Sequence, residues 1–325
     1  MGFLNEIWYL FRRNNWMIDP RFFLPVYKDV NVDRPIFLLG NQGGGLTLVT
    51  RMLRRNREVV SVTGNNRYWS GADELQNVMG PILPAELTGV RHKAPLHPTL
   101  SPPRSWSYAS DTLFSAYRKT EDDRTEELEY RFMRVLKYII GRYGKNGRGR
   151  FVDKSQVYTV RLSLLHRLLR ECDPKFILVT RNPYVECPRA AMGKAGDMRR
   201  YTNFLSWEDR LGLCIQHWRN SIQSVREDMS RQGIRVWIVQ LEEILNSPRD
   251  RILELCDFAE LEFSEDMLPQ KNQQVPFGSH YRDRWFPLRR NVNAAYRGRI
   301  SKKDMEIVEN LCGQLAEDLG YTKSF

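Results

Sequence analysis

The stretch from residue 35 to 53 constrains the fold more than any other part of the sequence. It begins with four apolar residues (36–39), continues with the run GNQGGG (40–45), and then repeats apolar side chains at helical spacing from Leu46 to Leu53. This order predicts a buried strand, a tight turn and an amphipathic helix. The N–H groups of such a turn converge near the positive end of the helix dipole, so we expect a phosphate or sulfate to bind there. The alternative is a glycine-rich turn that only connects the two elements.

The spacing within this turn narrows the class of nucleotide. A nucleoside-triphosphatase loop has the pattern G-x-x-x-x-G-K-[ST], in which the lysine reaches the β- and γ-phosphates. Gly40, Gly45 and Thr47 fit the pattern, but Leu46 stands at the lysine position. The loop therefore predicts poor ATP turnover and suits a nucleotide with a single 5′ phosphate-type group. A kinase-like phosphotransferase remains an alternative.

Further strands and helices alternate along the chain. Short apolar runs predict strands at 59–62, 151–154, 176–179 and 236–239, and apolar spacing predicts helices at 122–140, 160–169, 207–229 and 248–258. Such alternation is typical of an α/β fold, here a P-loop-like, three-layer domain with a central parallel sheet flanked by helices. We expect a leader segment over residues 1–33 and a single domain over 34–325. Ligands of these sheets bind at the carboxyl ends of the strands, where the glycine loop and Arg181 both fall.

The charge of the chain favours an anionic ligand. Its 325 residues include 50 basic and 39 acidic ones, for a net charge of +11. The basic residues are spread along the sequence, and no signature of a nucleic-acid-binding module is visible, so we expect no nucleic-acid partner.

The cysteines and the first residues bear on location. The five cysteines are widely spaced and form no C-x-x-C pair, which argues against a disulfide framework or a zinc site and favours the reducing cytoplasm. The apolar patch in residues 1–16 is interrupted by Asn5 and Glu6. It is too short to be a signal peptide or to span a bilayer, but an amphipathic segment of this kind can make peripheral contact with a membrane or a partner.

Three ordered motifs resemble those of the sulfotransferases that use 3′-phosphoadenosine 5′-phosphosulfate (PAPS), particularly bacterial members related to the carbohydrate and tyrosylprotein branches. The first is the glycine loop at 40–47. The second is Asp153-Lys154-Ser155, which is similar to the lysine-serine/threonine segment of the family. The third is the strand at 176–180 that ends in Arg181, similar to the arginine that grips the 3′-phosphate. The resemblance extends over most of the chain from about residue 35.

This resemblance implies a donor site and a reaction. PAPS would be the donor and 3′-phosphoadenosine 5′-phosphate (PAP) the product, with no metal required. The donor-binding positions that it implies are Gln42, Gly43, Gly44, Gly45, Leu46, Thr47, Arg181 and Arg189. Two of them depart from the family pattern: Gly43 stands where a Lys or Arg is usual, and Arg189 replaces a serine. Lys154, Arg51 or Arg54 would have to supply the charge that Gly43 lacks.

The sequence offers three candidates for the general base. Where the related branches place a glutamate, this chain has Gly64-Asn65-Asn66. Glu74 is the nearest downstream carboxylate and is our leading candidate, with His92 and His97 in a proline-rich loop (80–106) as alternatives. We expect His166, His217 and His280 to be structural. An aromatic wall for the acceptor is one interpretation of four further residues, and core packing is the other: Tyr68, Trp69, Trp106 and Tyr108.

The function expected from the sequence is transfer of a sulfuryl group from PAPS to a hydroxyl, or an amine, of a small molecule, glycan or lipid. A catalytically weakened nucleotide-binding protein is the alternative from a different class, because of Gly43. The identity of the acceptor is not encoded in any motif, and the oligomeric state is likewise open.

Overall fold

The structure is a computed structural model that describes most of the chain. The described residues are 7, 10–11, 14–63, 74–89, 94–101, 106–194, 196–269, 276–277, 282–283, 288 and 292–323.

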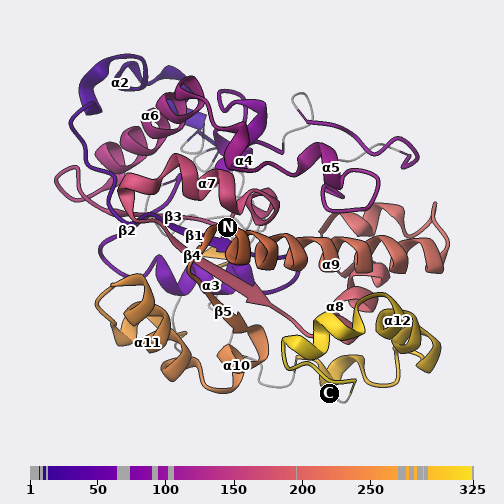
Figure 1. The fold of residues 1–325 in the computed structure, drawn as a ribbon. Coiled ribbons are helices and arrows are strands. Elements are labelled where there is room, and N and C mark those ends of the chain that lie inside the picture. Colours follow the sequence, from indigo (N-terminus) through magenta and orange to yellow (C-terminus); the bar gives the residue numbers. More distant parts are fainter. Residues whose placement is uncertain are drawn as a thin grey trace.

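A parallel sheet of five strands forms the centre of the molecule (Figure 1). Its order is β2-β3-β1-β4-β5. The strands are β1 (Ile36–Leu39), β2 (Val59–Val60), β3 (Arg150–Asp153), β4 (Lys175–Thr180) and β5 (Val236–Gln240). In this register Ile36 of β1 lies beside Val152 of β3 and Lys175 of β4. All carboxyl ends therefore lie at one edge, which brings the glycine loop after β1 next to Arg181 after β4.

Helices cover the sheet on both sides. Their bounds are α2 (Pro20–Phe23), α3 (Leu46–Leu53), α4 (Leu75–Val78), α5 (Phe114–Tyr117), α6 (Glu126–Tyr143), α7 (Leu162–Leu168), α8 (Pro183–Arg189), α9 (Trp207–Gln232), α10 (Leu241–Asn246), α11 (Pro248–Ala259) and α12 (Lys302–Asp318). A separate two-stranded sheet pairs β6 (Pro276–Phe277) with β7 (Arg282–Asp283). This arrangement is the α/β, P-loop-like fold that the alternation of apolar runs predicted.

The period-two alternation of β1 divides the core into two layers. Ile36 and Leu38 pack with apolar residues of α3, α10 and α11 on one face. Phe37 and Leu39 pack with those of α6, α7 and α9 on the other. Both sets are almost fully buried, as expected for strands with helices on both faces.

Some expected boundaries were wrong. The helix predicted over 122–140 begins at Glu126, because Thr125 caps it through a bond from the Leu128 amide, and it continues past Gly141 to Tyr143. The helix predicted from residue 160 begins at Leu162, because a 3₁₀ helix (Gln156–Val160) precedes it. The strand predicted over 59–62 ends at Val60.

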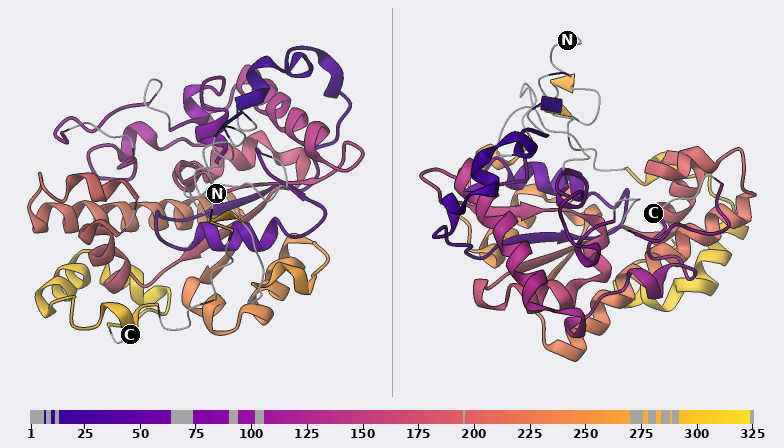
Figure 2. Two further views of the ribbon diagram at one scale, coloured as in Figure 1. Left: turned by 180° about the vertical axis from the view of Figure 1, so that it is seen from behind. Right: turned by 90° about the horizontal axis from the view of Figure 1, so that it is seen from above.

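The segment before β1 packs on the domain through α6. Trp16 and Phe22 are buried, and the Phe22 ring meets Tyr138 edge-on at 5.0 Å between centroids. Tyr138 Oη also donates to Asp19 Oδ2 at 3.0 Å. In the views from two further directions this segment and α6 lie at the end of the molecule away from α12 (Figure 2).

Within the described residues, no helix is both long enough and apolar enough to cross a bilayer.

Candidate active site

The glycine loop begins at a position where only glycine fits. Gly40 has a φ of +141°, and a Cβ there would stand 2.4 Å from the carbonyl oxygen of Val179 in β4. The Gly40 amide donates to Thr159 Oγ1 at 2.9 Å. The end of β1 is thus held between β4 and the 3₁₀ helix, and the loop starts from a fixed point.

The loop ends against the start of α10. Gly45 caps α3 with a φ of +105°, and a Cβ there would stand 2.6 Å from Leu241 Cδ1. The Leu46 side chain, which replaces the lysine of a triphosphatase loop, is buried in the core layer of α3 and α10. The Leu48 amide donates to the Gly45 carbonyl at 2.9 Å, whereas the amides of Leu46 and Thr47 precede the first bond of the helix and lie at the positive end of its dipole.

Arg181 lies beside this loop in a largely buried position. Its Nη1 donates to the Gly43 carbonyl oxygen at 3.3 Å, while Nε and Nη2 donate to Asn293 Oδ1 at 3.2 and 2.9 Å. Asn293 Nδ2 donates in turn to Glu242 Oε1 at 2.7 Å, so Asn293 connects Arg181 to a carboxylate. The guanidinium is thereby fixed in orientation before any ligand binds.

Arg189 stands at the end of α8 close to Arg181. Its Nε donates to Tyr296 Oη at 3.1 Å, and its buried Nη1 has no hydrogen-bond partner among the described residues. Burial lowers the pKa of Arg181, and the neighbouring charge of Arg189 lowers it further. Two adjacent cations, one with an unused donor, form a site that an anion would stabilise.

Glu186 lies behind the loop and is buried. A Cβ on Gly44 would stand 3.4 Å from its Oε1, and that oxygen has no hydrogen-bond partner among the described residues. Burial raises the pKa of Glu186 to about 8, and the charge of Arg181 opposes this rise. The carboxyl group is therefore mostly protonated at neutral pH.

Glu74 and Lys154 form a buried ion pair at the carboxyl end of β3. Lys154 Nζ lies 2.6 Å from Glu74 Oε1, and the two side chains are 2% and 7% exposed. Glu74 Oε2 accepts from Gln76 Nε2 at 2.6 Å and Asn77 Nδ2 at 3.0 Å. Both oxygens of the leading base candidate are thus occupied, and Lys154, a candidate replacement for the missing loop cation, binds this carboxylate.

The other cations considered for that replacement lie on α3. Arg51 and Arg54 are both buried. Burial, followed by the charge of Arg54, lowers the pKa of Arg51 to about 9.

A small cavity adjoins the loop between α8 and α9. Its volume is about 30 Å³, and its lining includes Asn41, Trp106, Glu186 and His217. Each of these four side chains carries a buried polar atom without a partner among the described residues: Asn41 Oδ1, Trp106 Nε1, Glu186 Oε1 and His217 Nδ1. This is enough room for a water molecule or the hydroxyl end of a ligand, and these atoms would complete its hydrogen bonds.

His217 is held against aromatic rings. The ring centroids of His217 and Tyr108 are 4.5 Å apart, and that of Trp106 lies 6.2 Å from the same imidazole. Burial lowers the pKa of His217 to about 4, so the imidazole is neutral at pH 7. Sequence reasoning assigned it a structural role, and its spacing on α9 gave no signal of an open nitrogen.

The remaining candidates are placed as follows. His97 is buried, its Nδ1 lies 3.2 Å from Thr99 Oγ1, and burial lowers its pKa. Trp106 contacts the cavity, whereas Tyr108 donates through Oη to the Gln156 carbonyl at 2.8 Å. Other candidates lie outside the described residues: His92, His280, Tyr68 and Trp69.

Sequence reasoning missed Asn293, Tyr296 and Glu242. Asn293 and Tyr296 follow β4 by more than a hundred positions, and a lone Asn or Tyr carries no local motif. The signal for Glu242 was its place directly after the apolar strand β5, in the first turn of α10.

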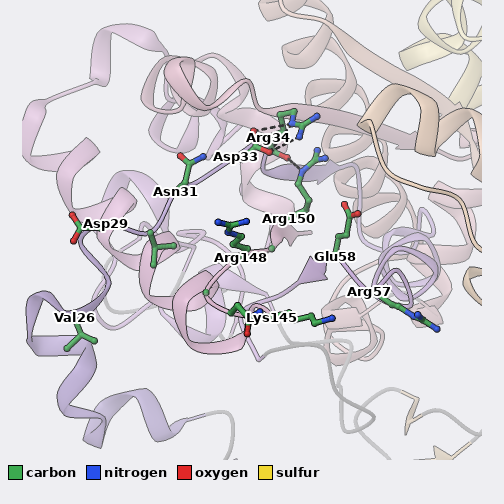
Figure 3. Close-up of a pocket in the computed structure, with 14 residues that line it drawn as sticks. Val26, Asp29, Asn31, Asp33, Arg34, Arg57, Glu58, Lys145, Arg148 and Arg150 are labelled. Atoms are coloured by element: carbon green, nitrogen blue, oxygen red, sulfur yellow. Dashed lines mark hydrogen bonds and ion pairs between the residues drawn. The ribbon is translucent and has the colours of Figure 1, made fainter.

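A second concavity lies at the opposite edge of the sheet (Figure 3). It is lined by residues that precede β1, β2 and β3, including Arg34, Arg57 and Arg148. Arg34 is paired with Asp33 at 2.8 Å. Because the strands are parallel, this concavity at their amino ends is separated from the glycine loop by the length of the strands.

Among the described residues, no group of three or more His, Cys, Asp or Glu side chains could hold a metal ion.

Comparison with known proteins agrees with this arrangement. Residues 35–265 match the sequence model described as "Sulfotransferase family", and the chain therefore belongs to the sulfotransferase family. Among the curated protein sequences, no match was found.

Solved structures share the fold. The chain is similar to the "Sulfotransferase Domain from the Curacin Biosynthetic Pathway", with a TM-score of 0.52, 17% identity, and coverage of 90% of this chain and 99% of that one. It is also similar to the sulfotransferase STF9 from Mycobacterium avium, with a TM-score of 0.53, 14% identity, and coverage of 95% and 81%.

Proposed function

We propose that the protein transfers a sulfuryl group from PAPS to a hydroxyl, or an amine, of a small molecule, glycan or lipid. The observation that carries this proposal is the pair Arg181 and Arg189 beside the glycine loop, with the buried Arg189 Nη1 lacking a partner among the described residues. A 3′-phosphate would supply the missing acceptor and compensate two adjacent cations. A donor with one phosphate-type group on its 5′ carbon and another on its 3′ carbon fits the glycine loop and the arginine pair.

Each part of the donor has residues suited to it. The amides of the loop and of the first turn of α3 would hold the 5′-phosphosulfate, whose role is to bring an activated sulfuryl group and a phosphate leaving group. Thr47 in that turn adds a hydroxyl. Arg181 would bind the 3′-phosphate through the N–H groups of Nη1 and Nη2 that its bonds to Gly43 and Asn293 leave free. The glycine at position 43 leaves room for close approach but supplies no charge.

The acceptor must lose a proton as its oxygen attacks. We assign the proton acceptor to the cavity beside the loop, where the neutral imidazole of His217 has an open Nδ1. An acceptor hydroxyl there would donate to His217 and accept from Trp106 Nε1. Glu74 is less suited, because Lys154, Gln76 and Asn77 already occupy its oxygens.

A catalytically weakened nucleotide-binding protein is the second candidate. Gly43 lacks the usual cation, and Lys154 is held in an ion pair 2.6 Å from Glu74. A kinase-like activity is disfavoured, because the buried Leu46 stands at the lysine position.

We place the activity in the reducing cytoplasm, in keeping with five free cysteines, four of them buried.

Ligand-induced stabilisation tests the donor. PAP should raise the free energy of unfolding by ~2.7 kcal/mol at a concentration of about 100 Kd. ATP with Mg²⁺ at the same concentration should give a much smaller shift. Equal shifts would count against the proposal. PAP binding without sulfate transfer from labelled PAPS to a broad acceptor panel would favour the weakened binding protein.

A further inference from the structure

A concave surface between α2 and α6 combines apolar and basic side chains. Its volume is about 310 Å³, and we call it the α2–α6 groove. Its apolar lining includes Phe23, Leu24 and Tyr130, which are 62%, 57% and 64% exposed. Side chains of this size are rarely exposed together on a protein surface without a partner.

Among the described residues, every charged side chain that lines the α2–α6 groove is basic. These residues are Arg21, Lys28, Arg134 and Lys137. Arg134 Nη2 donates to the Phe22 carbonyl at 3.0 Å, and Lys137 Nζ donates to the Lys28 carbonyl at 2.7 Å. Arg134 and Lys137 are therefore held on the backbone of residues 22–28, which also carry the exposed apolar side chains.

The exposed apolar surface continues along the same segment. Met17 and Ile18 are 55% and 71% exposed. They precede α2 within a few residues, and the segment lies at one end of the molecule (Figures 1 and 2). In the part of the chain that the structure describes, no acidic side chain lines the groove, whereas Asp29 and Glu58 accompany the arginines in the concavity at the amino ends of the strands.

We propose that this face docks on an anionic lipid bilayer. Aromatic and aliphatic side chains would enter the interfacial region, and Lys28, Arg134 and Lys137 would bind lipid phosphates. Arg21 is already paired with Asp19 at 2.9 Å. The aromatic and arginine side chains would also suit a protein partner, but lysines are depleted at the centre of protein interfaces, and the two lysines here favour lipid phosphates. The proposal concerns attachment to a surface and is independent of the donor and the acceptor.

Vesicle co-sedimentation of the whole protein tests this docking. Vesicles of phosphatidylcholine with about a third phosphatidylglycerol should bind it at least ~10-fold more strongly than pure phosphatidylcholine. High salt should reduce the difference. Equal binding to the two compositions, or no binding to either, would overturn the proposal.

Surface variants locate the contact. The double substitution Phe23→Ser/Leu24→Ser removes exposed side chains and should lower the partition coefficient by about tenfold or more. Phe204→Ser is the matched control, because Phe204 is 70% exposed and does not line the groove. Lys28→Gln should lower binding to anionic vesicles about 5-fold.

The variants must keep the melting temperature of the wild type for this comparison. Unchanged binding of the double variant would overturn the proposal. So would a dimer in solution that the double variant disrupts, if the wild type does not bind vesicles.

Discussion

Arg181 donates two hydrogen bonds to the side-chain oxygen of Asn293, a residue 112 positions further along the chain. The contact fixes the guanidinium beside the glycine loop. Asn293 in turn donates a hydrogen bond from its Nδ2 to Glu242. Trp218 Nε1 also donates to the Arg181 carbonyl at 3.2 Å, so both the backbone and the side chain of this arginine are held. A preorganised cation binds an anion without the entropy cost of ordering a long side chain.

The first prediction concerns recognition of the 3′-phosphate. Arg181→Ala should weaken PAP binding by roughly 2–5 kcal/mol, because one partner of a buried charge pair is lost. Adenosine 5′-phosphate, which lacks the 3′ group, should bind the variant and the wild type almost equally in calorimetry. Arg148→Ala is the control, since this exposed arginine lies at the opposite edge of the sheet. Equal losses for both nucleotides would mean that Arg181 supports the fold and does not read the 3′-phosphate.

The second prediction concerns the Glu74–Lys154 pair. Glu74→Gln leaves the Lys154 charge buried without its carboxylate, so it should lower the free energy of unfolding by about 3–5 kcal/mol. Lys154→Met should have a similar effect, and the double variant should recover part of the loss. Urea titration of the four proteins measures this coupling.

A catalytic role for Glu74 would give a different pattern. Glu74→Gln would then keep the stability and the PAP affinity of the wild type while lowering turnover by about 10² to 10⁴-fold. That result would return the general base to Glu74 and remove His217 from the assignment.

The third prediction concerns pH. The pKa of Glu186 rises from 4.5 to about 8 in the folded protein because of burial. Between these values the folded state binds more protons than the unfolded state. Stability is therefore lost as the pH rises through this window, with a slope of at most about 1.4 kcal/mol per pH unit from this group.

Glu186→Gln isolates that contribution, because glutamine resembles the protonated carboxyl and does not titrate. In unfolding experiments from pH 5 to 8, the variant should show a flatter profile and be more stable than the wild type near the upper end. Parallel profiles for the two proteins would show that Glu186 does not titrate in this range.

Local patterns determined much of this protein. The alternation of apolar runs and amphipathic helices specified the α/β class, because each strand buries both faces and each helix only one. The glycine run after β1 located the tight turn between β1 and α3, since positive φ values and close approach to Val179 exclude larger residues. The position of Arg181 after β4 was equally readable, because parallel strands bring their carboxyl ends to one edge.

Tertiary structure decided the rest. Asn293 and Tyr296 reach the arginines only because a segment distant in sequence returns to the carboxyl edge of the sheet. Glu74 was the nearest downstream carboxylate in the sequence, and only folding places Lys154 against it at 2.6 Å. The sequence around His217 predicts only an amphipathic helix. Packing of α9 beside the loop places the His217 side chain in the lining of a cavity. Burial and partner assignment depend on contacts between remote segments, and these are absent from any local pattern of residues.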